Sequence, residues 1–203
     1  MCNHYRTDRA VLSTWRDYIG WSLPTQPELP LDLAEDVWPK RRGLVARIGD
    51  SGEQIIETMA WGVPRTMPGK RPGTTVTNYV TNVRNLDSPF WRSMLVQPTR
   101  RCLVPFTEFA EPVIGGGRSE HWFRVLDRPV AAFAGIWRPS EAGEVYAFLT
   151  CEPNSLMAPL HPKAMPVILP EDDYERWLAA PWDEAKALVQ PFPAQLMAVK
   201  TGS

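Results

Sequence analysis

The sequence predicts an α+β fold, with one domain over residues 1–203 built mainly from antiparallel strands and edged by peripheral helices. Proline is the first indication, because its 21 copies are spread along the chain and break regular elements into short strands and loops. The second is a series of short apolar segments separated by turn residues. The third is that no repeat, low-complexity tract or linker divides a chain whose length suits one domain.

The first part of the chain predicts a helix, a loop and a hairpin. Apolar residues recur at helical spacing over residues 8–19, which predicts a helix. Residues 22–40 are rich in proline and are typical of a surface loop. The apolar segments 43–48 and 54–61 lie on either side of Asp50-Ser51-Gly52, which is the pattern of a β-hairpin.

The second part of the chain predicts further strands, turns and helices. Strands are expected over residues 101–106, 121–126, 130–137 and 145–150. Turns are expected at residues 115–117 and 127–129. Helices are expected over residues 171–179 and 182–189, the first with Tyr174, Trp177 and Leu178 facing inward.

The composition excludes several classes of protein. With 44% hydrophobic and 22% charged residues, the chain is typical of globular proteins rather than disordered ones. No stretch approaches the roughly 18 apolar residues of a membrane helix, and the polar start lacks the apolar region of a secretory signal. Cys2, Cys102 and Cys151 cannot all pair within the chain, so we expect a reducing, cytoplasmic location. We expect Cys102 and Cys151 to be buried thiols in strands.

Charge is concentrated in the middle of the chain, although the whole carries a net charge of -1. Residues 40–101 hold 11 Lys and Arg against 4 Asp and Glu, between two acidic flanks. A patch of this kind attracts polyanions, although these cations are also compatible with an ordinary solvated surface. The candidate contacts to a polyanion are Arg41, Arg42, Arg47, Lys70, Arg71, Arg84, Arg100 and Arg101. If the polyanion is a single-stranded nucleic acid, Trp61 and Pro64 are candidates for packing against an unstacked base.

Cys2 is the residue with the most distinctive chemistry. Removal of Met1 would give Cys2 a free α-amine beside its thiol, with reference pKa values of about 8 and 8.5. An aldehyde forms an imine with such an amine, and the thiol then closes a five-membered thiazolidine. The same terminus is also suited to act as a nucleophile in acyl transfer. An inert cysteine after the initiator methionine is the alternative.

Several separated motifs, taken in order, resemble the SRAP (SOS response-associated peptidase) family, which shields abasic sites in single-stranded DNA. The motifs are Met1-Cys2, Trp61–Pro64, Asn82–Asn85, Arg101–Pro105 followed by Glu111, Ala134–Trp137, His161–Leu169 and Trp177-Leu178. The resemblance spans nearly the whole chain. It implies a compact, barrel-like, largely β domain with surrounding helices and a positively charged DNA groove.

The resemblance also implies roles for individual residues. Cys2 would be the nucleophile that forms a thiazolidine with the ring-opened sugar. Asn82 would hydrogen-bond the α-amine, and Arg84 would hold a phosphate. Glu111 would serve ring opening and proton transfer, and His161 would protonate the sugar oxygen.

The sequence departs from the family pattern at three places. Residues 108–112 read Glu-Phe-Ala-Glu-Pro where the family has Gly-Phe/Tyr-Tyr-Glu-Trp, so Glu108 is a rival for the carboxylate role of Glu111. Lys163 stands where Arg is usual, and Asn3 stands where Gly is more common. These departures indicate a divergent member.

Three functions are therefore open. The first is covalent attachment to abasic sites in single-stranded DNA, by a protein that is associated with the nucleoid when bound. The second is a thiol peptidase, or autopeptidase, that uses Cys2. The third is non-covalent binding of single-stranded DNA. No Cys or His pair has zinc-ligand spacing and no nucleotide-binding motif is present, so we expect no metal and no cofactor, and we expect a monomer.

Overall fold

A computed structural model gives the structure of the protein, and it describes residues 2–8 and 34–202. Strands dominate these residues, and nearly all of them pair antiparallel. The prediction of a mainly antiparallel α+β fold with few short helices is confirmed. All but the first residue of the predicted helix over residues 8–19, and most of the predicted loop over residues 22–40, lie outside the described residues.

The centre of the fold is a closed barrel of five strands, which we call the barrel. Its strands are β3 (Arg42–Ile48), β4 (Gln54–Trp61), β8 (Arg101–Phe106), β11 (Ala131–Ser140) and β12 (Gly143–Cys151). Neighbouring strands pair antiparallel, and the ring closes through a parallel pairing of β12 with β4, in which Tyr146 lies opposite Trp61. The predicted hairpin and four predicted strands are all found, with ends shifted by a few residues.

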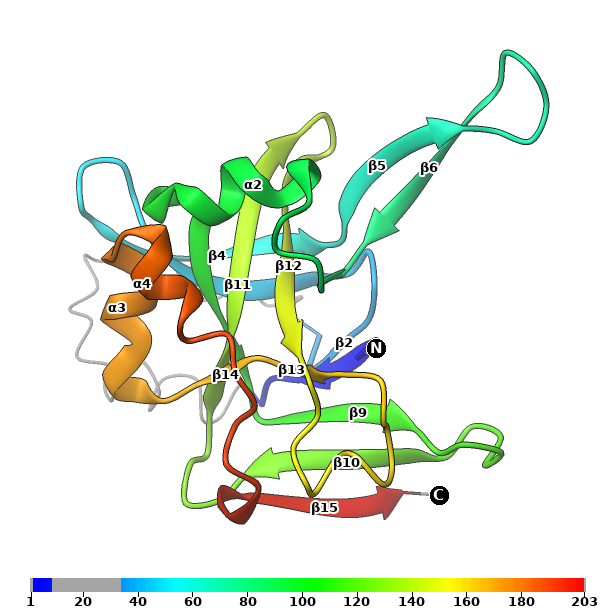
Figure 1. Cartoon of the computed structure of the whole chain (residues 1–203), viewed down its shortest axis with the longest axis vertical. Coiled ribbons are helices and arrows are strands. Elements are labelled where there is room, and N and C mark those ends of the chain that lie inside the picture. Colours follow the sequence, from blue (N-terminus) through cyan, green and yellow to red (C-terminus); the bar gives the residue numbers. More distant parts are fainter. Residues whose placement is uncertain (1, 9–33, 203) are drawn as a thin grey trace.

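Beside the barrel lies a second antiparallel sheet, which we call the N-terminal sheet. Its strands, in spatial order, are β15 (Met197–Gly202), β10 (Glu120–Val125), β9 (Glu108–Pro112), β1 (His4–Arg6) and β2 (Asp36–Val37). Figure 1 shows β9, β10 and β15 below the barrel strands. Strand β2 corrects the predicted loop 22–40 at its end, because Asp36 and Val37 pair with β1.

Smaller elements complete the fold. A hairpin of β5 (Val63–Pro68) and β6 (Thr75–Val80) projects away from the barrel, as Figure 1 shows. The short strands are β7 (Asn82–Val83), β13 (Met165–Pro166) and β14 (Ile168–Leu169). The helices are α2 (Pro89–Val96), α3 (Tyr174–Ala179) and α4 (Trp182–Lys186), with 3-10 turns η1 (Pro98–Arg100), η2 (Glu171–Asp173) and η3 (Ala194–Leu196). Sequence patterns missed α2, β5 and β6, as well as β1, β2, β9 and β15 of the N-terminal sheet and the short strands β7, β13 and β14.

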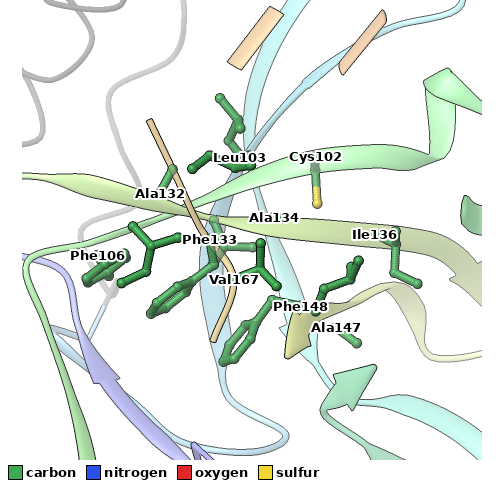
Figure 2. Packing of buried hydrophobic residues seen from close by; sticks show 14 of the residues in the cluster. Cys102, Leu103, Phe106, Ala132, Phe133, Ala134, Ile136, Ala147, Phe148 and Val167 are labelled. Carbon is green, nitrogen blue, oxygen red and sulfur yellow. The ribbon is translucent and has the colours of Figure 1, made fainter. Parts of the chain in front are cut away.

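Aromatic side chains fill the space inside the barrel and beneath it. The Phe106 and Phe133 rings stack with centroids 3.9 Å apart, and Phe148 lies 4.6 Å from Phe133 (Figure 2). Phe109 of β9 reaches this cluster at 5.6 Å from Phe133, so the N-terminal sheet packs on the barrel through it. Aromatic contacts of this kind add to the hydrophobic gain of burial and fix the two sheets in one arrangement.

One glycine makes the tight packing of β11 possible. A Cβ on Gly135 would lie 2.7 Å from Sγ of Cys102 and 2.8 Å from Cγ2 of Val104. Both contacts are shorter than van der Waals distance, so only glycine lets β11 and β8 approach this closely. Cys102 and Cys151 are buried free thiols in strands, as predicted.

Candidate active site

Cys2 lies inside the structure rather than on its surface. Strand β1 sits between β9 and β2, and this pairing carries Cys2 to a position with no solvent exposure. The Cys2 thiol donates to the carbonyl oxygen of His4 at 3.4 Å. Burial, together with the negative charge of Glu111, holds the pKa of this thiol well above its usual range. The thiol is therefore neutral and needs a base before it acts as a nucleophile.

Glu111 and His161 form a buried acid–base pair. Oε2 of Glu111 lies 3.5 Å from Nε2 of His161, and the two residues are 0% and 8% exposed. Burial raises the pKa of Glu111 to about 7, so the carboxyl is only partly ionised at neutral pH. The same cause lowers the pKa of His161, which favours the neutral ring.

A backbone contact fixes the tautomer of His161. Its Nδ1 lies 2.9 Å from the carbonyl oxygen of Ala164, and a carbonyl only accepts, so Nδ1 carries the hydrogen. In the neutral ring Nε2 is then an acceptor that faces Glu111. A proton on the Glu111 carboxyl can pass to Nε2 of His161 and back. The pair can therefore act both as a proton donor and as a proton acceptor.

Asn82 fixes the backbone of Cys2. The side-chain amide of Asn82 donates to the Cys2 carbonyl oxygen at 3.0 Å and to Oγ1 of Thr81 at 2.8 Å. The predicted bond of Asn82 to the α-amine of Cys2 needs removal of Met1 and stays a prediction, whereas the bond present here is to the Cys2 carbonyl oxygen. The Asn82 oxygen is buried and makes no hydrogen bond with any residue in the described part of the chain.

These four residues come from segments that are far apart in the sequence. Cys2 precedes β1, Asn82 begins β7, Glu111 lies in β9, and His161 lies in the loop between β12 and β13. Pairing of β1 with β9 and of β7 with β12 brings them together. The rival carboxylate Glu108 instead pairs with Lys200 at 2.9 Å and with Arg6 at 3.8 Å.

A basic groove of about 760 Å³ lies at the base of the β5–β6 hairpin. Its cations are Lys40, Arg42 and Arg138, opposed by the single carboxylate of Glu141 among the lining residues. The Nζ atom of Lys40 lies 4.7 Å from the centre of the Tyr79 ring, which is 43% exposed. Along the chain, Tyr79 of the groove precedes Thr81 by two residues, and Thr81 accepts from Asn82.

The structure sorts the predicted DNA contacts into groups. Arg42 and Pro64 line the groove, whereas sequence reasoning missed Lys40, Tyr79 and Arg138. Arg41, Lys70 and Arg71 are exposed, the latter two in the turn of the β5–β6 hairpin. Arg84 is exposed and pairs with Glu152. Arg47 pairs with Glu57 at 2.5 Å, and the guanidinium groups of Arg47 and Arg100 both lie over the Trp137 ring.

Two of the predicted DNA contacts were wrong. Trp61 has no exposure, because its ring stacks on Phe148 at 5.1 Å and its indole N–H donates to the Thr81 carbonyl. Arg101 also has no exposure and donates to the Ala180 carbonyl oxygen. Neither side chain meets solvent, so neither contacts DNA in this conformation. Both sit where a barrel strand faces the core, a placement that residue type alone does not reveal.

Within residues 2–8 and 34–202, no three His, Cys, Asp or Glu side chains gather in a way that suits a metal ion. The helices in this part of the chain are all too short or too polar to cross a membrane. The groups that the site brings together are the Cys2 thiol, the Glu111–His161 pair and the Asn82 amide.

Comparison with known proteins gives a family match over almost the full length. The family model described as SOS response associated peptidase (SRAP) matches residues 1–202. No curated protein matches the chain.

Solved bacterial structures share the fold at low sequence identity. A protein from Bordetella bronchiseptica has 24% identity and a TM-score of 0.77, with 100% of both chains covered. A protein from Bacteroides thetaiotaomicron has 22% identity and a TM-score of 0.73, covering 98% of this chain and 91% of that one. A phage-related protein from Bordetella bronchiseptica has 19% identity and a TM-score of 0.70, covering 99% and 94%.

Proposed function

Because this chain belongs to the SRAP family of SOS response associated peptidases, which supports a function related to DNA damage, we propose that it attaches itself covalently to abasic sites in single-stranded DNA. The attachment is a thiazolidine formed by Cys2 after removal of Met1, and it shields the damaged site. The observation that carries the proposal is the convergence of Cys2, Asn82, Glu111 and His161 from four separate segments.

The reaction needs proton transfers that suit the Glu111–His161 pair. Opening the closed sugar requires a proton on the ring oxygen and loss of a proton from the anomeric hydroxyl. The α-amine of Cys2 then adds to the aldehyde carbon, and loss of one water gives the imine. The thiol of Cys2 adds to the imine carbon while its proton passes to the nitrogen, which closes the ring. Glu111, with a pKa of about 7, serves as acid in one step and base in another.

Two features of the site are requirements of the proposal. Met1 must be removed, because a peptide bond at the Cys2 nitrogen leaves no amine to form an imine. The segment that contains Cys2 must also move to expose the thiol, because Cys2 has no solvent exposure in this structure. The unbonded, buried oxygen of Asn82 is suited to accept from the ammonium group that removal of Met1 creates.

The groove at the base of the β5–β6 hairpin supplies the DNA contacts in this proposal. Arg42, Arg138 and Lys40 bind phosphates, and Tyr79 offers a partly exposed ring for stacking. Contacts of this kind read the backbone and an unpaired nucleotide rather than the sequence. We therefore infer that binding has little sequence preference and falls as salt rises.

The test uses protein whose intact mass shows that Met1 is absent, mixed with a single-stranded oligonucleotide that carries one abasic site. A species that survives heat denaturation is expected with the wild type and with Cys151→Ala, a matched control for loss of a buried thiol. Cys2→Ala should give no such species. An undiminished adduct in Cys2→Ala rejects the proposal, and salt-sensitive binding with no heat-stable species leaves only non-covalent binding.

A thiol peptidase is the second candidate, favoured by the family's description and by a cysteine beside a carboxyl–imidazole pair. A peptidase turns over a peptide many times per molecule of enzyme, whereas self-attachment consumes one molecule of protein for each site. Repeated cleavage of a peptide library that Cys2→Ala does not cleave would favour the peptidase.

A further inference from the structure

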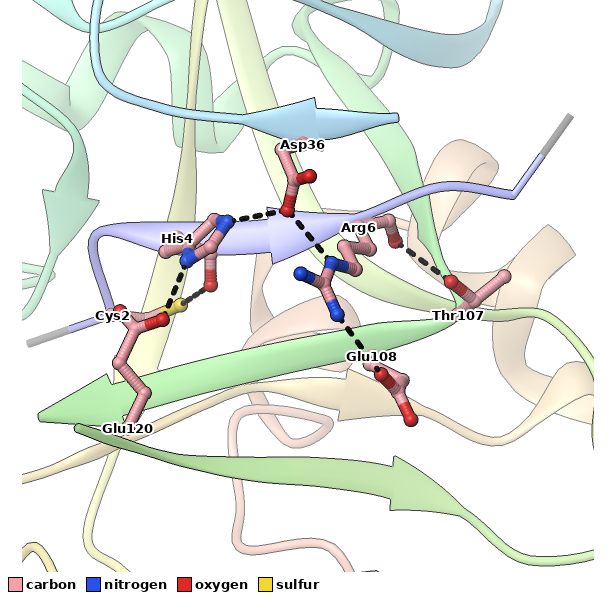
Figure 3. A network of polar contacts seen from close by, with 7 residues as sticks. All are labelled: Cys2, His4, Arg6, Asp36, Thr107, Glu108 and Glu120. Carbon is pink, nitrogen blue, oxygen red and sulfur yellow. Dashed lines mark hydrogen bonds and ion pairs between the residues drawn. The ribbon is translucent and has the colours of Figure 1, made fainter. Parts of the chain in front are cut away.

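His4 is held at both ring nitrogens by carboxylates. Its Nε2 lies 2.7 Å from Oδ1 of Asp36, and its Nδ1 lies 2.9 Å from Oε2 of Glu120 (Figure 3). When both carboxyl groups are ionised they only accept hydrogen bonds, so both ring nitrogens donate and the ring is the doubly protonated imidazolium. His4 is 5% exposed, and charge-assisted contacts at such a position are strong.

Aromatic rings and a second cation restrict the His4 ring further. It stacks on Trp38 with centroids 3.7 Å apart and meets the edge of Trp122 at 4.6 Å. The Nε atom of Arg6 shares the Asp36 carboxylate at 2.7 Å. These contacts restrict the ring, and its carboxylate partners lie on β2, which is next to β1, and on β10, which is two strands from β1.

One hydrogen bond and one electrostatic interaction connect His4 to the candidate active site. The backbone carbonyl of His4 accepts the Cys2 thiol, so movement of His4 moves the group that orients the sulfur. Glu120, the partner of Nδ1, is also one of the charges that raise the pKa of Glu111. Loss of the His4 charge would leave the Glu120 carboxylate uncompensated near Glu111.

We propose that His4 is a positioning residue for the N-terminal nucleophile: its imidazolium clamps the start of β1 to β2 and β10 and so holds Cys2 beside Glu111. The effect on DNA attachment rests on the proposed function, whereas the clamp itself does not. Anchoring of this kind matters because small misplacements of a reacting group slow a reaction greatly.

The variants separate the charge of His4 from its shape. His4→Arg keeps a permanent cation that can donate to both carboxylates, whereas His4→Gln is neutral and can donate from one end only. Lys200→Gln is the matched control, because Lys200 is 64% exposed and belongs to the same ion-pair network through Glu108. Thermal unfolding of each variant checks that it is folded.

Alkylation of Cys2, followed by peptide mass, tests the clamp without DNA. His4→Gln should raise the alkylation rate of Cys2 about tenfold, because opening of the first residues limits access to a buried thiol. His4→Arg and Lys200→Gln should react like the wild type. Equal rates for His4→Gln and wild type overturn the clamp, and so does a fast rate for His4→Arg.

The rate of adduct formation at saturating abasic DNA tests the effect on the reaction. His4→Gln should lower it about tenfold, with unchanged affinity for an oligonucleotide that carries a tetrahydrofuran in place of the abasic sugar. A wild-type rate, or an equal loss of affinity, overturns the positioning role. If wild-type protein forms no adduct while the alkylation difference stands, the proposed function fails and the clamp is kept.

The pH profile of adduct formation gives a readout that a merely structural role would not move. The charged groups concerned are Asp36 on β2, Arg6 on β1, Glu108 and Glu111 on β9, Glu120 on β10, Lys200 on β15 and His161 in the loop that follows β12. Glu120→Gln removes a negative charge and should shift the Glu111 midpoint to lower pH. His4→Gln should shift it to higher pH. Shifts in the same direction would overturn the proposal.

Discussion

The barrel and the N-terminal sheet are both antiparallel structures of short strands, but they bury different side chains. The large buried groups of the barrel strands include the rings of Phe106, Phe133 and Phe148. The N-terminal sheet buries His4, Glu111 and His121 among its apolar residues. Burial of an ionisable group costs free energy unless it is paired or neutralised, so the sheet carries a cost that the barrel interior mostly avoids.

The difference shows that one region provides a rigid framework and the other provides the titratable side chains. The barrel is mainly a close-packed apolar scaffold that holds geometry, with Tyr146 and Arg101 as its large buried polar exceptions. The N-terminal sheet supplies the titrating groups, and the candidate site lies where the sheet meets β7 and the loop after β12. Substitutions in the barrel should therefore change stability, and those in the sheet should change chemistry.

Removal of the central barrel ring should give the largest effect. Phe133→Ala should lower the free energy of unfolding by about 3–5 kcal/mol, because four aromatic neighbours lose a partner and a cavity remains. Denaturant unfolding measures the loss. The fraction that stays folded should still form the adduct at the wild-type rate, and a specific loss of rate would break the division between the two regions.

Replacement of the buried Glu111 carboxyl should raise the free energy of unfolding, in contrast to Phe133→Ala. Because the folded-state pKa of Glu111, about 7, exceeds its unfolded value of about 4.5, the folded state binds the proton more tightly. Stability from this group is present at low pH and is lost as pH rises through about 7. Glu111→Gln should therefore stabilise the fold by about 2–3 kcal/mol at about pH 8 while abolishing the adduct.

Thermal unfolding at about pH 5 and about pH 8 measures this gain, which should appear mainly at the higher pH. Glu108→Gln, in the same strand but in an ion pair with Lys200, is the matched control and should show no such gain. A loss of stability at both pH values in Glu111→Gln would contradict the assignment of burial as the cause.

Arg101 is the exception among the barrel strands and offers a smaller test. Its guanidinium has no exposure, and Nε and Nη1 make no hydrogen bonds with the residues that the structure describes. Burial lowers the pKa of Arg101 to about 10. Arg101→Met should stabilise the fold by about 1 kcal/mol or more, measured by denaturant unfolding, because a desolvated charge is replaced by an apolar chain. A large loss of stability would show that the Arg101 guanidinium makes an interaction that the fold needs.

The smallest effect is expected in the groove. Arg42→Gln should weaken binding of single-stranded DNA a few-fold and reduce the slope of log affinity against log salt by about 1. Fluorescence anisotropy at several salt concentrations measures both. Arg92→Gln, an exposed arginine of α2 outside the groove, should leave the slope unchanged. Equal slopes for the two variants would remove Arg42 from the binding surface.

Local patterns in the sequence were sufficient for the barrel strands. The hairpin of β3 and β4 was predicted from two apolar segments and a turn, because strand pairing across a short turn is a local property. Strands β5 and β6 were missed, since their exposed residues carry no apolar alternation. Strands β1 and β2 were missed because each is short and pairs with distant partners.

The four site residues were identified through the family resemblance, whereas the clamp around His4 was not foreseen. Nothing near His4 in the sequence indicates that Asp36 and Glu120 will face its two nitrogens. The same limit explains the errors at Trp61 and Arg101, whose residue types suggested surface roles.

The sequence by itself determined the class of fold, the position of a cysteine at residue 2 and the presence of a basic middle segment. Only the tertiary structure decided which cations face solvent, which carboxylate stands beside the imidazole, and that Cys2 is closed off. The physical reason is range: turns and alternation act over a few neighbours, whereas burial and charge pairing depend on residues that the chain brings together from far away.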